Sequence, residues 1–178
     1  NDAPARAAAT PARTPRDESA GKSAGQTVTS SVGLTISDAD PGALQGMAIT
    51  GTVSGLGRWQ YSVNNGASWA DVGTTSDSAA LLLRAEDRVR YVPNGGIGTN
   101  ASFSYRAWDQ TGSTLGAQGT RPAVTGPGGT SPYSTATNTA TIVVTSVNSA
   151  PQWHNVGNGS VTTAVGTGTD FARGTVVQ

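Results

Sequence analysis

The sequence predicts an all-β protein folded as a β-sandwich, and three observations lead to this fold class. Short segments rich in alternating apolar residues recur at intervals of roughly ten residues, as in sandwich domains. Glycine accounts for 24 of the 178 residues and lies mostly between these segments, where turns favour it. No stretch repeats apolar residues with the 3.6-residue period of an amphipathic helix.

The chain begins with a segment that is too rich in proline to be helical. Residues 3–16 consist mainly of Ala, Pro and Arg, so an extended lead-in or an edge strand is expected there. The first clear strand is expected over residues 27–36, because Leu34 and Ile36 keep the period of two of a half-buried strand. Its apolar positions are Val28, Val32, Leu34 and Ile36.

A hairpin is the most secure local prediction, and it follows a strand expected over residues 47–53. Residues 58–63 alternate, so that Trp59, Tyr61 and Val63 share one face. The turn Asn64-Asn65-Gly66 follows, and Asn and Gly tolerate the positive φ that tight hairpin turns require. The chain then returns over residues 67–72 as the partner strand, which carries Trp69.

Four further segments complete the expected sandwich. Three of them are a short buried strand at Leu81-Leu82-Leu83, a strand over residues 88–92, and an alternating strand over residues 100–108. Residues 110–136 are dominated by Gly, Thr, Ser and Pro, which indicates an extended surface loop. The last strand is expected over residues 137–147, with Ala140, Ile142 and Val144 facing inward.

Composition excludes several classes of function. The chain has 11 basic and 11 acidic residues, so it lacks the positive field that holds nucleic acid or an anionic membrane. It has no cysteine, which removes disulfides, thiolate metal sites and cysteine nucleophiles. Its single histidine has no Ser/His/Asp arrangement around it, so we expect no enzyme. No run of about 18 apolar residues is present, so no membrane insertion is expected.

The loop Asp38-Ala39-Asp40-Pro41-Gly42 carries the chemistry of the sequence. Its two carboxylates lie two residues apart before a Pro-Gly turn, so they are expected to point toward one place and to repel each other. A cation relieves this repulsion, and Ca²⁺ suits a site built only from oxygen ligands. A plain solvated turn is the competing interpretation of this motif.

Other acids are expected to join this loop, because a sandwich gathers its loops at two poles. Asp109 follows the strand over residues 100–108, and Asn1 and Asp2 lie where the chain enters the domain. We call the pole that these residues would share the N-terminal pole. The predicted ligands of Ca²⁺ there are Asn1, Asp2, Asp38, Asp40 and Asp109.

Several motifs occur together in an order that resembles the cadherin-like repeats of large bacterial surface adhesins. They are Asn1-Asp2-Ala3-Pro4, Asp38-Ala39-Asp40, Gly55-Leu56-Gly57-Arg58-Trp59-Gln60-Tyr61-Ser62, Ser78-Ala79-Ala80-Leu81-Leu82-Leu83, Arg90-Tyr91-Val92-Pro93-Asn94, Tyr105-Arg106-Ala107-Trp108-Asp109 and Asn148-Ser149-Ala150-Pro151. The resemblance covers roughly residues 1–151. It implies a Greek-key β-sandwich whose joints to neighbouring repeats bind Ca²⁺.

The resemblance also implies a second calcium site at the opposite, C-terminal pole. Its expected residues are Glu18, Glu86, Asp87 and Asn148. Ser149 stands where the linker of such repeats normally has Asp, so this second site is expected to be weak or empty. The lead-in after Pro4 is also richer in Ala and Arg than the resemblance suggests.

Three segments are expected from this organisation: a linker and lead-in strand at 1–16, the cadherin-like sandwich at 17–147, and a linker with the start of a next repeat at 148–178. The echo of Asn1-Asp2-Ala3-Pro4 by Asn148-Ser149-Ala150-Pro151 supports a tandem array. We expect an internal slice of a longer chain.

The predicted function is a calcium-stiffened structural and adhesive repeat of a long, secreted bacterial surface protein. Its expected partners are neighbouring repeats or identical subunits, and a surface glycan or a host or matrix protein. One alternative is a carbohydrate-binding module that uses Trp59, Tyr61 and Trp69 as an aromatic platform, although a core role for them is favoured. Another is a fibre subunit that donates residues 152–178 as a strand to its neighbour.

Overall fold

The computed structural model describes residues 1–6, 11–17, 21–32, 36–95, 97–111 and 117–146. These residues belong to one compact unit, Asn1–Val147. Residues 148–178, which were expected to form a linker and either the start of a next repeat or a donated strand, lie outside the described residues.

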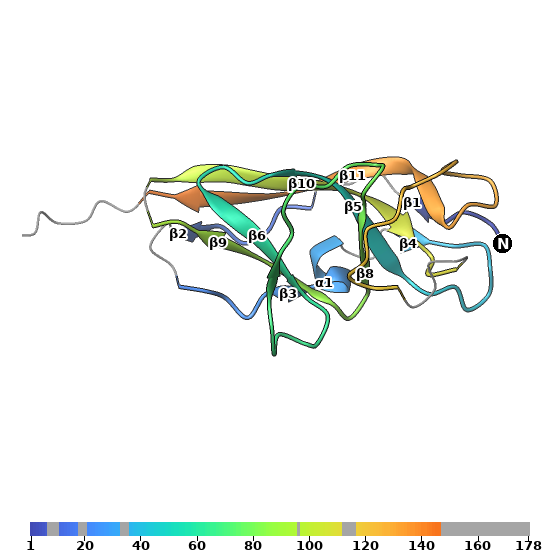
Figure 1. Cartoon of the computed structure of the whole chain (residues 1–178), viewed down its shortest axis with the longest axis horizontal. Coiled ribbons are helices and arrows are strands. Elements are labelled where there is room, and N and C mark those ends of the chain that lie inside the picture. The colour runs from blue at the N-terminus through green and yellow to red at the C-terminus, as the bar shows by residue number, and fades with distance from the viewer. Residues whose placement is uncertain (7–10, 18–20, 33–35, 96, 112–116, 147–178) are drawn as a thin grey trace, which may run out of the picture. The chain divides into compact units, whose positions relative to one another are not determined.

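Two sheets form the unit, and a two-stranded pair accompanies them (Figure 1). The five-stranded sheet has the order β2 (Arg16–Asp17), β11 (Tyr133–Thr145), β10 (Thr99–Trp108), β5 (Gly46–Val53) and β8 (Leu81–Arg84). The four-stranded sheet has the order β3 (Gln26–Thr27), β9 (Arg88–Pro93), β6 (Gly57–Ser62) and β7 (Ala70–Asp71). The pair joins β1 (Ala5–Arg6) to β4 (Ile36–Ser37).

Strand pairing is antiparallel except between β2 and β11, which run parallel. This all-β architecture confirms the predicted β-sandwich. The Greek-key connectivity stays a prediction.

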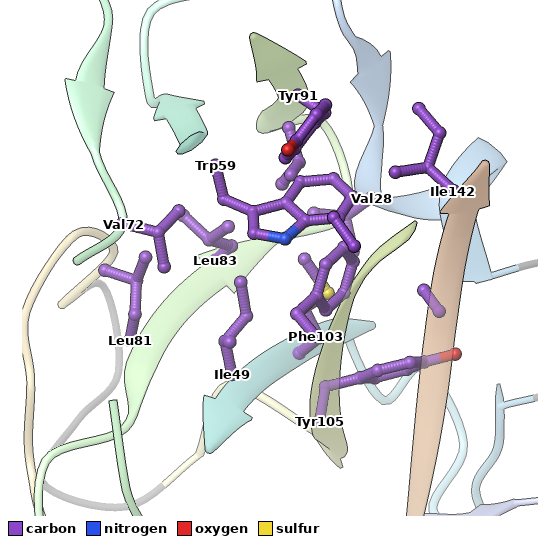
Figure 2. Close-up of a cluster of buried hydrophobic side chains, with 14 of the residues drawn as sticks. Val28, Ile49, Trp59, Val72, Leu81, Leu83, Tyr91, Phe103, Tyr105 and Ile142 are labelled. Carbon is purple, nitrogen blue, oxygen red and sulfur yellow. The ribbon is translucent and has the colours of Figure 1, made fainter. Parts of the chain in front are cut away.

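The core lies between the facing sides of the two sheets (Figure 2). The Trp59 ring meets the Tyr91 and Phe103 rings edge to face, with centroid separations of 5.1 and 5.0 Å. Aromatic pairs favour this geometry because the positive edge of one ring meets the negative face of the other. Trp59 is only 1% exposed, so it is a core residue and not part of a sugar-binding platform.

A second apolar cluster covers the outer face of the five-stranded sheet. Trp108 and Tyr133 pack there with Ala48, Ala80 and Leu82. Trp108 points away from Phe103 as the alternation predicts, yet it is fully buried. The chain over residues 117–132 covers this cluster, and Val124 packs against it. This part of the expected surface loop therefore packs on the sheet.

Hydrogen bonds hold that covering segment to the free edge of β8. Leu82 donates its N–H to the Thr120 carbonyl at 3.1 Å, and its own carbonyl accepts from Gly119 N at 2.8 Å. Ala80 donates to the Pro122 carbonyl at 2.9 Å. The segment thus satisfies the backbone polar groups of an edge strand. The loop expected over residues 110–136 is also shorter than predicted, because β11 begins at Tyr133.

The predicted hairpin is present. Tyr61 in β6 pairs with Ala70 in β7, and the turn places Asn65 and Gly66 at φ values of 57° and 92°. The inward positions expected for the last strand, Ala140, Ile142 and Val144, are also buried.

The expected single strand over residues 27–36 is wrong at its centre, where α1 (Val28–Val32) forms a short helix. Side chains at its start explain this. Ser30 donates its N–H to Thr27 Oγ1 at 3.1 Å, which caps the helix, and Ser31 Oγ donates to the Thr27 carbonyl at 2.7 Å. Val28 remains buried in the core, so the burial was predicted correctly and the backbone was not.

The N-terminal segment lies along the sandwich. Ala12 bridges to Thr141 in β11, and Arg16–Asp17 pairs with the end of the same strand. Figure 1 shows β1 beside the N terminus and β2 toward the other end of β10 and β11. Residues from this segment therefore reach both ends of the five-stranded sheet.

Candidate cation site

The N-terminal pole is defined by one row of residues across the five-stranded sheet. Trp108 at the end of β10 pairs with Gly46 at the start of β5 and with Tyr133 at the start of β11. Asp109 follows Trp108 directly and therefore lies at the end of the central strand β10. Asp38 and Asp40 follow β4, which β1 pairs with near the N terminus.

The first two residues of the chain join these two loops. Asn1 Nδ2 donates to Asp109 Oδ2 at 3.1 Å, and the Asp2 backbone N–H donates to Asp40 Oδ2 at 2.8 Å. Ala3 N donates in turn to the Gly129 carbonyl at 2.7 Å. The structure thus brings all five predicted residues of this pole to one end of the sandwich.

Each acidic loop is shaped by its own carboxylate. Asp38 Oδ1 accepts the Asp40 N–H at 2.9 Å, and Asp109 Oδ1 accepts both the N–H and the hydroxyl of Thr111 at 2.7 Å. Gln110 between them adopts a φ of 65°, the left-handed conformation. These bonds fix where the carboxylates point.

One carboxylate oxygen at this pole has no partner among the described residues. Asp38 Oδ2 is buried and makes no hydrogen bond there, whereas its sister atom Oδ1 does. A buried oxygen of a carboxylate without a donor is costly, so it marks the place where a cation would lower the free energy. Carboxylate, amide and carbonyl oxygens are the ligands that Ca²⁺ prefers.

A cavity of about 300 Å³ lies at this pole. Its lining includes Asn1, Asp40, Asp109 and Thr111, but neither Asp2 nor Asp38. Within the described part of the chain, however, no three Asp, Glu, His or Cys side chains lie together as a metal-holding group. The carboxylates form two smaller sets. Asp38 and Asp40 share one loop, to which Asp2 is joined only through its backbone N–H, and Asp109 in the other loop is joined to the amide of Asn1.

Of the four residues expected at the C-terminal pole, the structure describes Glu86 and Asp87. Glu18 and Asn148 lie outside the described residues. Glu86 and Asp87 form the turn between β8 and β9, and Arg84 before them pairs with Gly46. The register therefore places this turn beyond the same sheet end as Asp109, because β8 runs antiparallel to β5.

Asp87 has a structural task in that turn. It is buried, and its Oδ2 accepts the Arg84 N–H at 2.8 Å. Burial raises the pKa of its carboxyl to about 6; the Arg84 hydrogen bond opposes this and the charge of Glu86 adds to it. Glu86 itself is exposed and lies 4.0 Å from Arg84 Nη1.

Sequence reasoning missed the neutral groups that complete the N-terminal pole. Thr111 braces Asp109, and the Thr130 carbonyl accepts a hydrogen bond from Asn1 Nδ2 at 3.3 Å. The first contact could have been predicted, because an Asp side chain often accepts a hydrogen bond from the backbone N–H two residues later. The second could not, since Asn1 and Thr130 are brought together only by the fold.

Comparison with protein-family models, with curated proteins and with solved structures found no match to this chain. Among the described residues, no helix has the length and apolar character needed to cross a membrane.

Proposed function

We propose that this chain is a non-catalytic structural and adhesive repeat of a long extracellular bacterial surface protein of the cadherin-like kind. Ca²⁺ at the N-terminal pole would stiffen the joint with whatever repeat precedes it. The observation that carries the proposal is that Asn1 and Asp2 bond to Asp109 and Asp40, so the incoming chain and both acidic loops form one polar assembly.

The contacts of the first residues support a stiff joint. The backbone of Asp2 is tied to Asp40, and that of Ala3 to Gly129, so the direction of the incoming chain is already restrained. Asp38 Oδ2, Asp40 and Asp109 are the oxygens that would hold the ion. Bound Ca²⁺ would supply the positive charge that these carboxylates lack, and it would link the two sets across the pole.

A calcium titration followed by thermal unfolding of the full chain tests the proposal. A ligand that binds only the folded state stabilises it by about 2.7 kcal/mol at 100 times its Kd. For a domain of this size we expect Tm to rise by roughly 5–10 °C at saturating Ca²⁺. The double variant D38N/D40N keeps the shape of both side chains and should lose most of this rise.

Two controls make the result specific. D71N removes a carboxylate of an exposed ion pair on β7, in the four-stranded sheet, and should leave the calcium-dependent rise unchanged. Mg²⁺ at the same concentration should give a smaller rise, because it demands octahedral geometry and dehydrates reluctantly. A Tm that stays constant up to 10 mM Ca²⁺, a range chosen from the roughly millimolar affinity of extracellular modules, would remove calcium from the function.

A further inference from the structure

A second cavity, of about 320 Å³, lies where the N-terminal segment crosses the sandwich. Four parts of the chain line it: residues 13–16, residues 23–26, the middle of β9 and Ile142 of β11. Its described lining contains three arginines, Arg13, Arg16 and Arg90, and no acidic side chain. A hollow surrounded by cations without carboxylates is unusual in a chain with no net charge.

Arg13 occupies the deepest position. It is buried, and the groups that accept its hydrogen bonds are neutral: Gln26 Oε1 and the Val89 carbonyl at 3.2 Å, and Ser31 Oγ at 2.6 Å. Its guanidinium carbon also lies 5.5 Å from the centroids of the Trp59 and Phe103 rings. Neutral acceptors and ring faces orient the guanidinium but leave its charge uncompensated.

Arg90 is held rigidly on the other side of the cavity. Its Nε and Nη2 both donate to Gln60 Oε1, at 3.0 and 2.7 Å, and its guanidinium carbon lies 3.9 Å from the centroid of Trp69. Burial lowers the pKa of Arg90, and the charges of Arg58 and Arg16 lower it further. Burial also lowers the pKa of Arg13, to about 10, so at neutral pH it stays protonated.

Two donors of this cavity are unused within the described structure. The Nε atoms of Arg13 and Arg16 are buried and make no hydrogen bond there. Burying a donor of a charged group without an acceptor costs free energy, so a small shift of either side chain that lets an external acceptor reach its Nε would be favourable. Guanidinium groups recognise carboxylate, sulfate and phosphate through charge-assisted hydrogen bonds.

We propose that this arginine cavity binds the oxyanion group of a small ligand, a carboxylate or a sulfate, carried by a molecule no larger than one acidic sugar residue. The charge fits because three arginines converge without an acidic lining residue. The volume fits because small-molecule sites begin at roughly 300 Å³. Tyr91 and Ile142 add an apolar wall, and Ser23 and Thr14 add polar groups at the rim, as a sugar ring requires.

The proposal is independent of calcium, because none of the residues of the N-terminal pole lines the arginine cavity. The test therefore uses metal-free buffer and the full 178-residue chain. Sodium sulfate, sodium acetate, sodium glucuronate and glucose are titrated separately at constant ionic strength made up with NaCl. Binding is followed by NMR through the Nε–Hε signals of Arg13 and Arg16.

If the cavity is an oxyanion site, sulfate and acetate shift both Nε–Hε signals in a saturable way and glucose does not. Glucuronate binding at least tenfold tighter than acetate would identify a whole acidic sugar as the ligand class, and equal affinities would identify the bare oxyanion. R16Q should weaken binding about tenfold or more, because it removes a donor and a charge from the rim. R84Q removes the same charge from β8, where Arg84 pairs with the exposed Glu86 outside the lining, and should bind like the wild type.

Two results would overturn the proposal. One is the absence of saturable shifts at either Nε–Hε signal up to 50 mM sulfate or glucuronate, a concentration about 50 times the Kd of a weak, millimolar site. The other is an equal loss of binding in R16Q and R84Q, which would show a general response to net charge. R16Q is chosen over variants of Arg13 because Arg13 bonds to the core and its replacement affects folding. Unfolding of R16Q by urea checks that it is folded.

Discussion

The N-terminal segment serves two regions of opposite charge, and they are built differently. At the N-terminal pole, Asp2 donates to Asp40, Asp40 donates its own N–H to Asp38, and Asp109 accepts from both Asn1 and Thr111, so each of the three carboxylates has a neighbouring donor. In the arginine cavity, Arg13 and Arg16 bring cations to a place that offers only neutral acceptors. The loops of the pole are shaped by hydrogen bonds within each loop. The arginine cavity forms only where residues 13–16, residues 23–26, β9 and β11 meet.

This difference shows where each region would respond to a ligand. Carboxylates at the pole lie on loops at the sheet edge, so a cation there would act on the incoming chain. The guanidinium of Arg13 lies between the two sheets, against Trp59 and Phe103, so an anion beside it would act on the packing of the N-terminal segment against the core. The predictions below test the two regions separately, from the largest expected effect to the smallest.

Removing the Arg13 side chain should give the largest loss of stability. Arg13→Ala leaves Gln26 and the Val89 carbonyl without their donor and opens a hole beside two aromatic rings. We expect a loss of about 3–5 kcal/mol in the free energy of unfolding, measured by urea denaturation. A loss below about 1 kcal/mol would contradict the burial of this side chain.

Arg13→Met is the matched control, because it fills much of the same volume without charge. Replacing a buried charge with an apolar side chain of similar size is often neutral or stabilising. We therefore expect R13M to lie within about 2 kcal/mol of the wild type. If R13M is as unstable as R13A, the hydrogen bonds of the guanidinium outweigh its packing.

The two regions also differ in how far they could be predicted. The acids of the N-terminal pole are local signals: Asp38-Ala39-Asp40 is a turn motif, and Asp109 ends an alternating strand. Strand ends are placed by the period of two, so their gathering at one pole followed from the fold class. The arginine cavity carries no such signal, because Arg13 and Val89 are joined by a hydrogen bond across 76 positions of the chain.

The same physical limit explains the other differences between expectation and structure. Alternation marked Trp108 as opposite to Phe103, but only the register of residues 119–122 against β8 shows that Trp108 is covered. The helix at Val28–Val32 depends on hydrogen bonds from Thr27, Ser30 and Ser31, which compete with strand geometry at the level of single side chains. Period and composition do not resolve such competition.

The buried carboxyl of Asp87 should make the stability of the domain depend on pH. Its folded pKa of about 6 lies above the unfolded value of about 3.9, so the folded state binds more protons between these values. Stability contributed by the protonated form is therefore complete below about pH 4 and is lost as pH rises through about 6. We expect Asp87→Asn to be more stable than the wild type by about 1–3 kcal/mol at pH 7.5 and equal to it at pH 4.

Urea unfolding of both proteins across this pH range measures the difference. Asn keeps an oxygen that accepts the Arg84 N–H, so the turn itself should persist. Glu86→Gln, which removes the charge that raises the pKa of Asp87, should give a smaller change in the same direction. A difference between D87N and wild type that does not vary with pH would contradict a raised pKa.

Asp109→Ala should reduce stability by about 1–2 kcal/mol in calcium-free buffer. The buried carboxylate accepts from Asn1 Nδ2 and from the N–H and hydroxyl of Thr111, so its removal leaves donors without an acceptor. Thermal and urea unfolding measure the loss. D71N weakens an exposed ion pair but keeps an oxygen that can accept from Gln60 Nε2, so it should cost less than about 0.5 kcal/mol. A similar loss in both variants would show that Asp109 is no better held than a surface acid.

The smallest effect concerns the ring that covers Arg90. Trp69→Leu removes a cation–π contact of 3.9 Å but keeps an apolar side chain over the guanidinium, so we expect a loss of about 0.5–1 kcal/mol. Gln60 still holds the guanidinium from the side, through two hydrogen bonds to its Oε1. Its positive charge therefore stays at the cavity in W69L, and sulfate should bind within about threefold of wild type while stability falls. Loss of both together would mean that Trp69, and not Gln60, positions Arg90.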